Sequence, residues 1–283
     1  MIAVADSGST KTDWRLYDRL HGVQEIQTTG LNPYFLSAKE ITNVLKKDLH
    51  PYFNNEGVSL VFFYGSGCSH DDKIMEVESA LSDFFPNARI SVESDLLGTA
   101  RALCGSDPGI VAILGTGSNS CIYNGNNITG QILSLGYILG DEGSGAVLGK
   151  TLLKAALSGS MPLDLLEKFL VAFPAKPDAV LERIYRQPFP NRYLASHVPF
   201  AVEHMNHEWM HDQLKRHLHG FFEQMVAVYE DFSHYTLNIS GSLAWHLKPL
   251  LLELCTEYGI RPGKILQKPI DDLLAYHLRH LAE

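Results

Sequence analysis

Short apolar runs and helically spaced apolar positions alternate along the first hundred residues. The run at 58–64 is almost wholly apolar, as expected of a parallel strand buried on both faces. Apolar residues in 37–49 recur at helical spacing behind Ser37, a residue type that caps helices. The pattern predicts strands at 2–6, 13–17, 23–28, 58–64 and 90–92, and helices at 37–49, 71–85 and 94–103.

A turn cluster with the sequence GSDPG, at 105–109, marks a candidate domain boundary. After it the chain again opens with an apolar strand, a turn of small residues and a returning strand. We therefore expect an α/β protein of two lobes, residues 1–105 and 106–283, although the two halves share too little sequence for a repeat. The second lobe is expected to have strands at 110–114, 120–123, 128–133, 236–239 and 265–266, helices at 142–157, 243–258 and 270–281, and a mostly helical segment at 160–235.

Charge and cysteine content narrow the choice of partners. The 283 residues carry a net charge of -9, and the 23 lysines and arginines form no dense cluster, so nucleic acid is not expected as a partner. The four cysteines form no CxxC pair, which favours reduced thiols and a cytoplasmic location. No apolar run approaches the roughly 18 residues that span a bilayer. A homodimer remains an open possibility.

Four turns that follow strands combine glycine with small hydroxyl residues. They are DSGST at 6–10, GTGSN at 115–119, GDEGSG at 140–145 and SGS at 240–242. Small residues let backbone N–H groups approach an anion closely, and hydroxyl groups add further donors. One such turn is common in α/β proteins, but four together are hard to explain as connectors alone.

The first of these turns has a tail, GSTKT, that looks like the end of a Walker A loop. The spacing excludes that motif, because Lys11 has no glycine directly before it. The Asp6 carboxylate would repel phosphate oxygens unless a cation stood between them, so Asp6 fits a ligand of Mg²⁺ or of a magnesium-bound water. On these residues alone, Asp6 as a simple cap of the turn is at least as well supported. Lys11 could contact a phosphate or point to solvent.

The four turns together resemble those of one superfamily. In this order and at these separations, DSGSTKT, GTGSNS, GDEGSG and ISGS are similar to the actin / hsp70 / sugar kinase superfamily. Within it, the chain is most similar to the N-acetylglucosamine kinase branch of the BadF/BadG/BcrA/BcrD ATPase family. The resemblance spans nearly the whole chain and is weakest at 160–235. It implies two ribonuclease-H-like lobes that close over a Mg-ATP cleft, with the last helix packing on the N-terminal lobe.

The resemblance also implies a set of nucleotide and metal contacts. The implied metal ligand is Asp6. The implied ATP-binding residues are Ser7, Gly8, Ser9, Thr10 and Lys11 in the first turn, Thr116 and Gly117 in the second, and Gly241 and Ser242 on the adenosine side.

Phosphoryl transfer to an alcohol needs in-line positioning, charge neutralisation and an acceptor for the alcohol's proton. Asp95 follows a strand and begins a helix, where an aspartate is by itself better explained as an N-cap. The stretch SDLLGTA, at 94–100, matches the pattern in which the kinase branch places its catalytic base. The resemblance therefore implies that Asp95 is the base.

Sugar contacts are implied in the same way. They are Asn32, Asp95, Ser118, Asn119, Gly136 and Asp141. The chain departs from the family at Ser134 and Leu135, where a Gly-Gly-aromatic segment is usual and only Gly136 is retained. This change alters the expected wall beside the sugar, so N-acetylmuramic acid competes with N-acetylglucosamine as the substrate.

The expected function is therefore ATP-dependent phosphorylation of the 6-hydroxyl of an N-acetylated amino sugar. A different enzyme of the wider family, the ATPase that activates 2-hydroxyacyl-CoA dehydratases, holds a [4Fe–4S] cluster with paired cysteines. The cysteines of this chain lack such neighbours. A nucleotide-dependent sugar sensor without catalysis would keep the same turns.

Six histidines gather at 197–219, and His204, His207 and His211 could share one helical face. Such spacing could bind Zn²⁺. The region has no HExxH motif and no neighbouring cysteine, so a solvated helix is favoured over a metal site.

Overall fold

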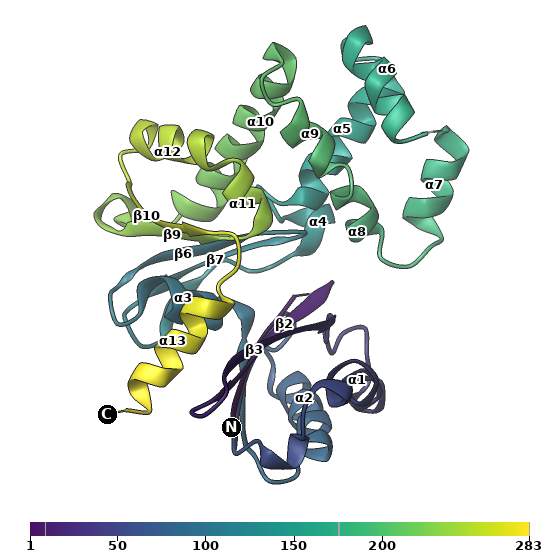
Figure 1. Ribbon diagram of the computed structural model, residues 1–283. Coiled ribbons are helices and arrows are strands. Elements are labelled where there is room, and N and C mark those ends of the chain that lie inside the picture. Colours follow the sequence, from purple (N-terminus) through teal and green to yellow (C-terminus); the bar gives the residue numbers. More distant parts are fainter. Residues whose placement is uncertain (9, 175, 283) are drawn as a thin grey trace. The chain divides into compact units, whose positions relative to one another are not determined.

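The computed structural model describes residues 1–8, 10–174 and 176–282. The chain forms two compact units, each built on one five-stranded sheet (Figure 1). Unit 1 comprises Met1–Asp107, Gly125–Asn127 and Lys268–Glu283, and unit 2 comprises Pro108–Asn124 and Ile128–Gln267. The predicted α/β class is confirmed.

The sheet of unit 1 has the strand order β3-β2-β1-β4-β5. Its strands are β1 (Ile2–Ser7), β2 (Lys11–Asp18), β3 (Gly22–Thr29), β4 (Leu60–Gly65) and β5 (Arg89–Ser94). The first three pair antiparallel, and β4 and β5 run parallel to β1. All five correspond to strands that the apolar pattern predicts.

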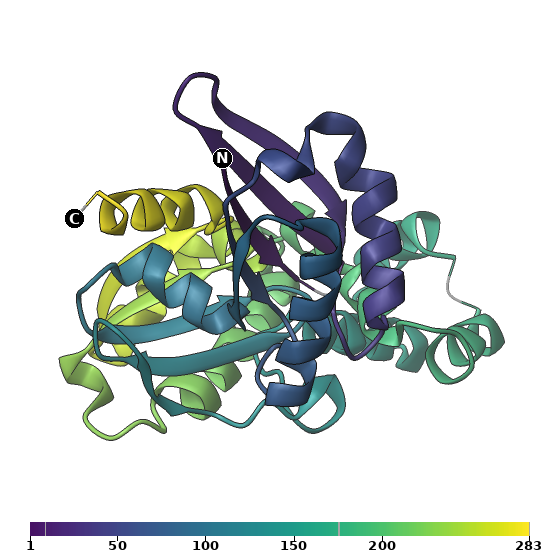
Figure 2. The same ribbon diagram turned by 90° about the horizontal axis from the view of Figure 1, so that it is seen from below.

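Helices cover both faces of this sheet. They are α1 (Ala38–Val44), continued by a π-helical turn (Leu45–Leu49), α2 (Asp71–Phe84), α3 (Asp95–Cys104) and α13 (Ile270–His280), with 3-10 turns at His50–Tyr52 and Asn55–Gly57. Side chains of a strand alternate between the two faces. Ala3 and Ala5 therefore face the core made with α1 and α2, whereas Val4 packs against Leu273 of α13. Figure 2 shows α13 and the pair α1 and α2 on opposite sides of the N-terminal strands.

The last helix, α13, belongs to unit 1 although it lies at the end of the chain. Its buried residues Ile270, Leu273 and Leu274 form one core with Val4 and Tyr64. The apolar stripe of α13 is thus buried on the N-terminal sheet, where the family resemblance places the last helix.

A polar contact adds to this packing. The Tyr64 hydroxyl and His277 Nε2 are 2.9 Å apart, and the His277 ring stacks on Phe62 with centroids 3.7 Å apart. Burial, with the nearby charges of Arg101 and His280, lowers the pKa of His277 to about 3. The imidazole is therefore neutral at pH 7, as its apolar surroundings require.

Unit 2 repeats the strand plan of unit 1. Its sheet has the order β10-β9-β6-β7-β8, with β6, β7 and β8 antiparallel and β9 and β10 parallel to β6. The strands are β6 (Gly109–Leu114), β7 (Ser118–Tyr123), β8 (Ile128–Gln131), β9 (Thr236–Ser240) and β10 (Arg261–Leu266).

Strand β10 is longer than the two residues expected. Its start contains Pro262 and Gly263, which are rare inside strands. The apolar pattern therefore predicted only its last two residues. The pairing with β9 shifts register at this point, and the Lys264 N–H donates instead to Asn238 Oδ1 at 2.9 Å. An irregular pairing therefore accommodates the two poor strand formers.

Nine further α-helices are described in unit 2. They are α4 (Gly136–Leu139), α5 (Gly145–Ser158), α6 (Leu163–Ala172), α7 (Pro177–Tyr185), α8 (Pro190–Ala195), α9 (Val198–Glu203), α10 (Glu208–Phe221), α11 (Ser242–His246) and α12 (Lys248–Glu257), with a π-helical turn at Phe222–Val226 and a 3-10 turn at Phe232–His234. The helix expected at 243–258 is two helices, since Pro249 starts a new one. Across the residues that the structure describes, no helix has both the length and the apolar character needed to cross a membrane.

The close packing of α3 on the sheet allows a stability test at Gly98. A Cβ atom there would lie 2.6 Å from Tyr64 Cγ and 2.8 Å from Tyr64 Cβ. We expect Gly98→Ala to lower the free energy of unfolding by about 1–3 kcal/mol, the usual cost of overpacking, as measured by urea unfolding. Gly220, in α10, is the matched control, because a Cβ atom there meets nothing within 4 Å. Gly220→Ala should stabilise by up to about 1 kcal/mol, and two variants that shift alike would contradict this packing.

Candidate active site

Asp6 lies near the end of β1, directly opposite Asp13 of β2. Directly paired residues of an antiparallel sheet point to the same face. The turn between the strands is closed by the backbone, with the Gly8 N–H donating to the Lys11 carbonyl at 3.0 Å. No hydrogen bond joins the Asp6 carboxyl to another residue that the structure describes, so a capping role for it is not seen there.

The surroundings of Asp6 favour its protonated form. Burial, with the negative charges of Asp95 and Asp13, raises the pKa of Asp6 to about 7. The positive charges of Lys11 and Lys268 act in the opposite direction. A carboxyl that is desolvated beside two others gains from a cation, which is the condition expected of a metal ligand.

The other residues of the first turn divide into buried and accessible groups. Ser7 is buried, and its hydroxyl lies 2.8 Å from Thr12 Oγ1 and accepts the Leu31 N–H at 3.1 Å. Thr10 is exposed, and the Lys11 side chain is 49% exposed. The remaining residue, Ser9, lies outside the described residues. The side-chain donors of the turn that solvent or a ligand can reach are therefore those of Thr10 and Lys11.

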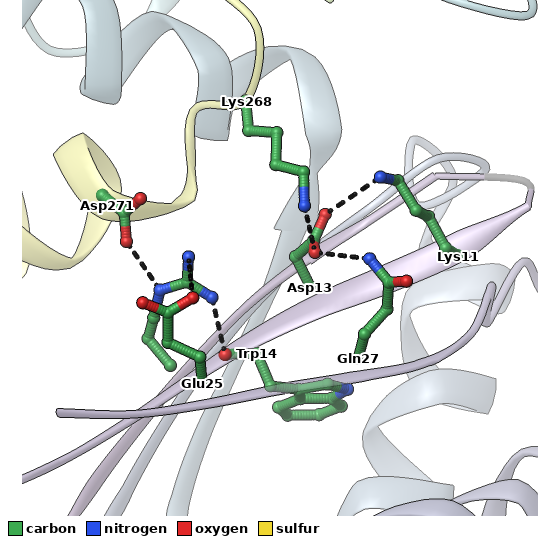
Figure 3. Close-up of polar contacts among 8 residues, drawn as sticks. Lys11, Asp13, Trp14, Glu25, Gln27, Lys268 and Asp271 are labelled. Carbon is green, nitrogen blue, oxygen red and sulfur yellow. Dashed lines mark hydrogen bonds and ion pairs between the residues drawn. The ribbon is translucent and has the colours of Figure 1, made fainter. Parts of the chain in front are cut away.

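Asp13 holds two lysines and an amide (Figure 3). Its Oδ1 accepts hydrogen bonds from Lys268 Nζ and Gln27 Nε2, both at 2.8 Å, and its Oδ2 lies 3.7 Å from Lys11 Nζ. Burial alone would raise the pKa of Asp13, but the bonds from Lys268 and Gln27 and the two lysine charges hold it below its usual value. The sequence analysis did not predict the contact of Lys268 with Asp13, because the two residues are far apart in the chain and Lys268 is part of no motif.

Asp95 is the first residue of α3, but it does not cap that helix. Ser94 is the N-cap, because its hydroxyl accepts the Leu97 N–H at 3.2 Å. Asp95 Oδ1 accepts the Leu96 N–H at 2.8 Å. Burial raises the pKa of Asp95 to about 6, although backbone hydrogen bonds oppose the rise. Unit 1 thus contains a second perturbed carboxyl that acts electrostatically on Asp6.

Asn32 is fixed in unit 1 beyond the end of β3. It is buried, its Oδ1 accepts the Tyr34 N–H at 2.9 Å, and its Nδ2 lies 3.4 Å from Ser66 Oγ. Gly67 has φ +88, and a Cβ atom there would lie 2.8 Å from Asn32 Oδ1. Close packing therefore holds the amide in one orientation.

In unit 2, the second and third turns meet at Asp141. Its backbone is left-handed (φ 61), which is uncommon outside glycine. Its carboxylate accepts the Ser118 N–H, and Ser118 Oγ donates to the Glu142 carbonyl at 2.8 Å. Burial raises the pKa of Asp141 to about 6, against the bond from Ser118. A Cβ atom at Gly117 would lie 3.1 Å from Asp141 Oδ2, so this position suits glycine.

The second turn is also fastened to the start of α5. The Gly145 N–H donates to the Gly115 carbonyl at 2.8 Å, and the Ala146 N–H to the Thr116 carbonyl at 3.0 Å. The turn at 240–242 lies beside the C-terminal end of β6, from which the second turn starts. Gly241 has φ +130, and a Cβ atom there would lie 2.1 Å from the Leu114 carbonyl oxygen. Only glycine fits this position, which brings the 240–242 turn beside β6.

The remaining predicted sugar contacts lie in accessible parts of unit 2. Asn119 Oδ1 accepts its neighbour's N–H, that of Ser120, at 2.9 Å. Gly136 has φ +70 and begins α4. Ser134 and Leu135, where the chain departs from the family pattern, are both exposed.

A solved structure from Porphyromonas gingivalis decides the family. That protein, named as a putative N-acetylglucosamine kinase, superimposes with a TM-score of 0.95 and is 38% identical over 99% of this chain and 100% of its own. The chain belongs to the N-acetylglucosamine kinase-like family of sugar kinases. The predicted family, actin-like ATPase fold and enzyme class are thereby confirmed.

More distant solved structures share the fold of this family. A putative N-acetylglucosamine kinase from Chromobacterium violaceum matches with a TM-score of 0.73 at 19% identity, over 97% of this chain and 98% of its own. A ROK family glucokinase from Streptomyces griseus, solved with glucose and AMPPNP, gives 0.51 at 15% identity, over 94% and 93%. No protein-family model matches the chain, and a search of curated proteins gives no match.

The histidine-rich segment of this kinase-like protein contains ordinary structural contacts. His207 Nε2 lies 3.3 Å from Asp164 Oδ2, and His204 Nδ1 lies 3.0 Å from the Phe200 carbonyl. Within residues 1–8, 10–174 and 176–282, no three His, Cys, Asp or Glu side chains are grouped to hold a metal ion. Mg²⁺ does not require such a group, because it usually keeps waters and binds one or two carboxylates with the substrate phosphates. Asp6 fits that mode of binding.

Proposed function

We propose that the protein transfers the γ-phosphoryl group of ATP to the 6-hydroxyl of an N-acetylated amino sugar, most specifically N-acetylglucosamine. The observation that carries this proposal is the likeness to the Porphyromonas gingivalis protein named as a putative N-acetylglucosamine kinase, 38% identical over 99% of this chain. Two perturbed carboxyls in unit 1 support it: Asp6 with a pKa of about 7 and Asp95 with a pKa of about 6. Perturbed carboxyls of this kind concentrate at functional sites. The glucokinase of the same fold, solved with AMPPNP, supports ATP as the donor.

In this proposal Asp95 is the general base. A base whose pKa lies near 6 is mostly ionised at pH 7 and still accepts a proton readily. The 6-hydroxyl oxygen forms a bond to the γ-phosphorus, the bond from that phosphorus to the bridging oxygen breaks, and ADP leaves. The hydroxyl proton passes to Asp95. Because Ser94 caps α3, Asp95 is not needed as the cap of that helix.

Asp6 is proposed to hold Mg²⁺, directly or through a bound water. When bound, the ion neutralises negative charge on the phosphates. Thr10, Lys11 and the backbone around Gly8 are proposed to bind phosphate, with Ser7 supporting the turn from its buried position. In unit 2 the proposed nucleotide contacts are Thr116, Gly117, Gly241 and Ser242.

The proposed sugar contacts are fixed within their own units. Asp141 is held by the Ser118 N–H, and Asn32 by backbone and packing contacts, so both present fixed hydrogen-bonding groups. Asn119 and Gly136 complete the proposed set. Since Ser134 and Leu135 are exposed, a bulkier 3-O-lactyl sugar is the competing substrate to test.

The protein is further proposed to act in the cytoplasm on small molecules, without a nucleic-acid or membrane partner. Its net charge of -9 supports the exclusion of nucleic acid.

A coupled ADP-release assay over a sugar panel tests the function. The panel contains N-acetylglucosamine, N-acetylmannosamine, N-acetylmuramic acid, glucose and 6-deoxy-N-acetylglucosamine. Turnover with N-acetylglucosamine and none with its 6-deoxy analogue is expected. Preference for N-acetylmuramic acid would replace the named sugar, ATP hydrolysis independent of sugar would point to an activator ATPase, and tight sugar binding without turnover would point to a sensor.

The role of Asp95 is tested by Asp95→Asn, which keeps the shape and removes the basic oxygen. We expect kcat to fall by about 10²–10⁴-fold, the usual contribution of a general base, with ATP affinity unchanged by calorimetry. Ser94→Ala is the control, because it removes the α3 cap at a cost of about 1 kcal/mol in stability but keeps the carboxylate. If Asp95→Asn retains more kcat than Ser94→Ala, the base is another residue.

A further inference from the structure

Lys268 lies just before α13, on the sheet face of unit 1 that carries Asp6. Lys11, Asp13 and Arg15 alternate along β2 and therefore share one face, and Asp6 joins them because it pairs directly with Asp13. Helix α13 covers the part of this face around Val4. The helix begins at Ile270, and just before it Lys268 contacts Asp13, the residue paired with Asp6 at the other end of the face.

At that end, two lysine ammonium groups flank one buried carboxylate. The Asp13 side chain is 8% exposed, whereas those of Lys11 and Lys268 are 49% and 40% exposed. An ammonium group has three N–H donors, and the hydrogen bond to Asp13 uses one of those on Lys268. Lys268 is therefore oriented by a buried partner while its remaining donors stay accessible.

Docking of α13 does not depend on the Lys268 contact. Arg15 Nε binds Asp271 Oδ1 at 2.6 Å and joins the same two elements, β2 and the start of α13 (Figure 3). The buried side chains of Ile270, Leu273 and Leu274 add an apolar contact. A partly exposed ion pair contributes only about 0–1 kcal/mol to stability. The Lys268–Asp13 pair therefore adds little to docking that is not already supplied.

The local charge balance gives the pair another use. The whole chain has a net charge of -9, and in unit 1 the negative charges of Asp95 and Asp13 act on Asp6, so a polyphosphate is repelled there unless cations are placed locally. The cluster of Lys11, Asp13 and Lys268 has a net positive charge beside Asp6. Lysine is a common phosphate-binding residue because its charge is compact.

We propose that Lys268 binds the β- or γ-phosphate of the nucleotide, that Asp13 is the positioning residue that holds it, and that α13 brings it to the site. This inference rests on the proposed function and extends it, since it gives the C-terminal helix a role in nucleotide binding.

Calorimetric titration of the full-length protein with MgATP, MgADP and AMP tests the inference, with melting temperature measured in parallel. Lys268→Met should weaken MgATP binding at least tenfold and leave AMP binding unchanged, because AMP lacks both phosphates. An equal loss of MgADP binding assigns the contact to the β-phosphate, and a loss with MgATP alone assigns it to the γ-phosphate. Lys268→Arg should recover most of the loss. Asp13→Asn, which frees Lys268, should weaken MgATP binding in the same direction.

Asp271→Asn is the matched control. It breaks the neighbouring contact of α13 with β2, and its side chain is 69% exposed and outside the proposed site. It should lower the melting temperature at least as much as Lys268→Met while leaving nucleotide affinity unchanged. If Lys268→Met binds MgATP like the unaltered protein, Lys268 is only a structural contact and the inference is wrong. If the unaltered protein binds no nucleotide, the proposed function fails as well, so the two failures are distinguishable.

Discussion

The antiparallel pairing of β1 with β2 is the constraint on which the candidate site of unit 1 depends. It places Asp6 opposite Asp13 and divides each strand between two faces. Alternate residues of β1 are buried against α1 and α2, and those between them meet α13. A slip of one residue would turn Asp6 into the apolar core and remove Asp13 from Lys268. Burial of both faces therefore fixes the geometry of the polar end.

The carboxyls of this polar end of the sheet, Asp6 and Asp95, lower the stability of the folded protein when nothing is bound to them. Asp6 and Asp95 are desolvated, and each carries a raised pKa because its ionised form has too few compensating partners. Apolar or better-paired residues at these positions would be more stable. Sites with this kind of local cost are typically retained for binding or catalysis. In unit 2, burial likewise raises the pKa of Asp141, whose backbone is in addition left-handed.

Local sequence signals predicted most strands, the main helices and the four glycine-rich turns, because apolar periodicity and turn chemistry act over a few residues. They did not distinguish Ser94 from Asp95 as the cap of α3, since both residue types cap helices. They did not reveal Lys268 beside Asp13, because that contact depends on where α13 packs and not on any nearby residue. Strand β10 was underestimated for a related reason: its Pro262 and Gly263 are poor strand formers that only the neighbouring strand makes tolerable.

The proposed site depends most on Asp6, which would serve nucleotide binding by holding a cation. Calorimetric titration of ATP into the unaltered protein and into Asp6→Asn, each with Mg²⁺ and with EDTA, tests it most directly. We expect ATP binding to the unaltered protein to weaken at least tenfold when Mg²⁺ is removed, and this dependence to be largely lost in Asp6→Asn. An Asp6→Asn variant with the full magnesium dependence of the unaltered protein would contradict it.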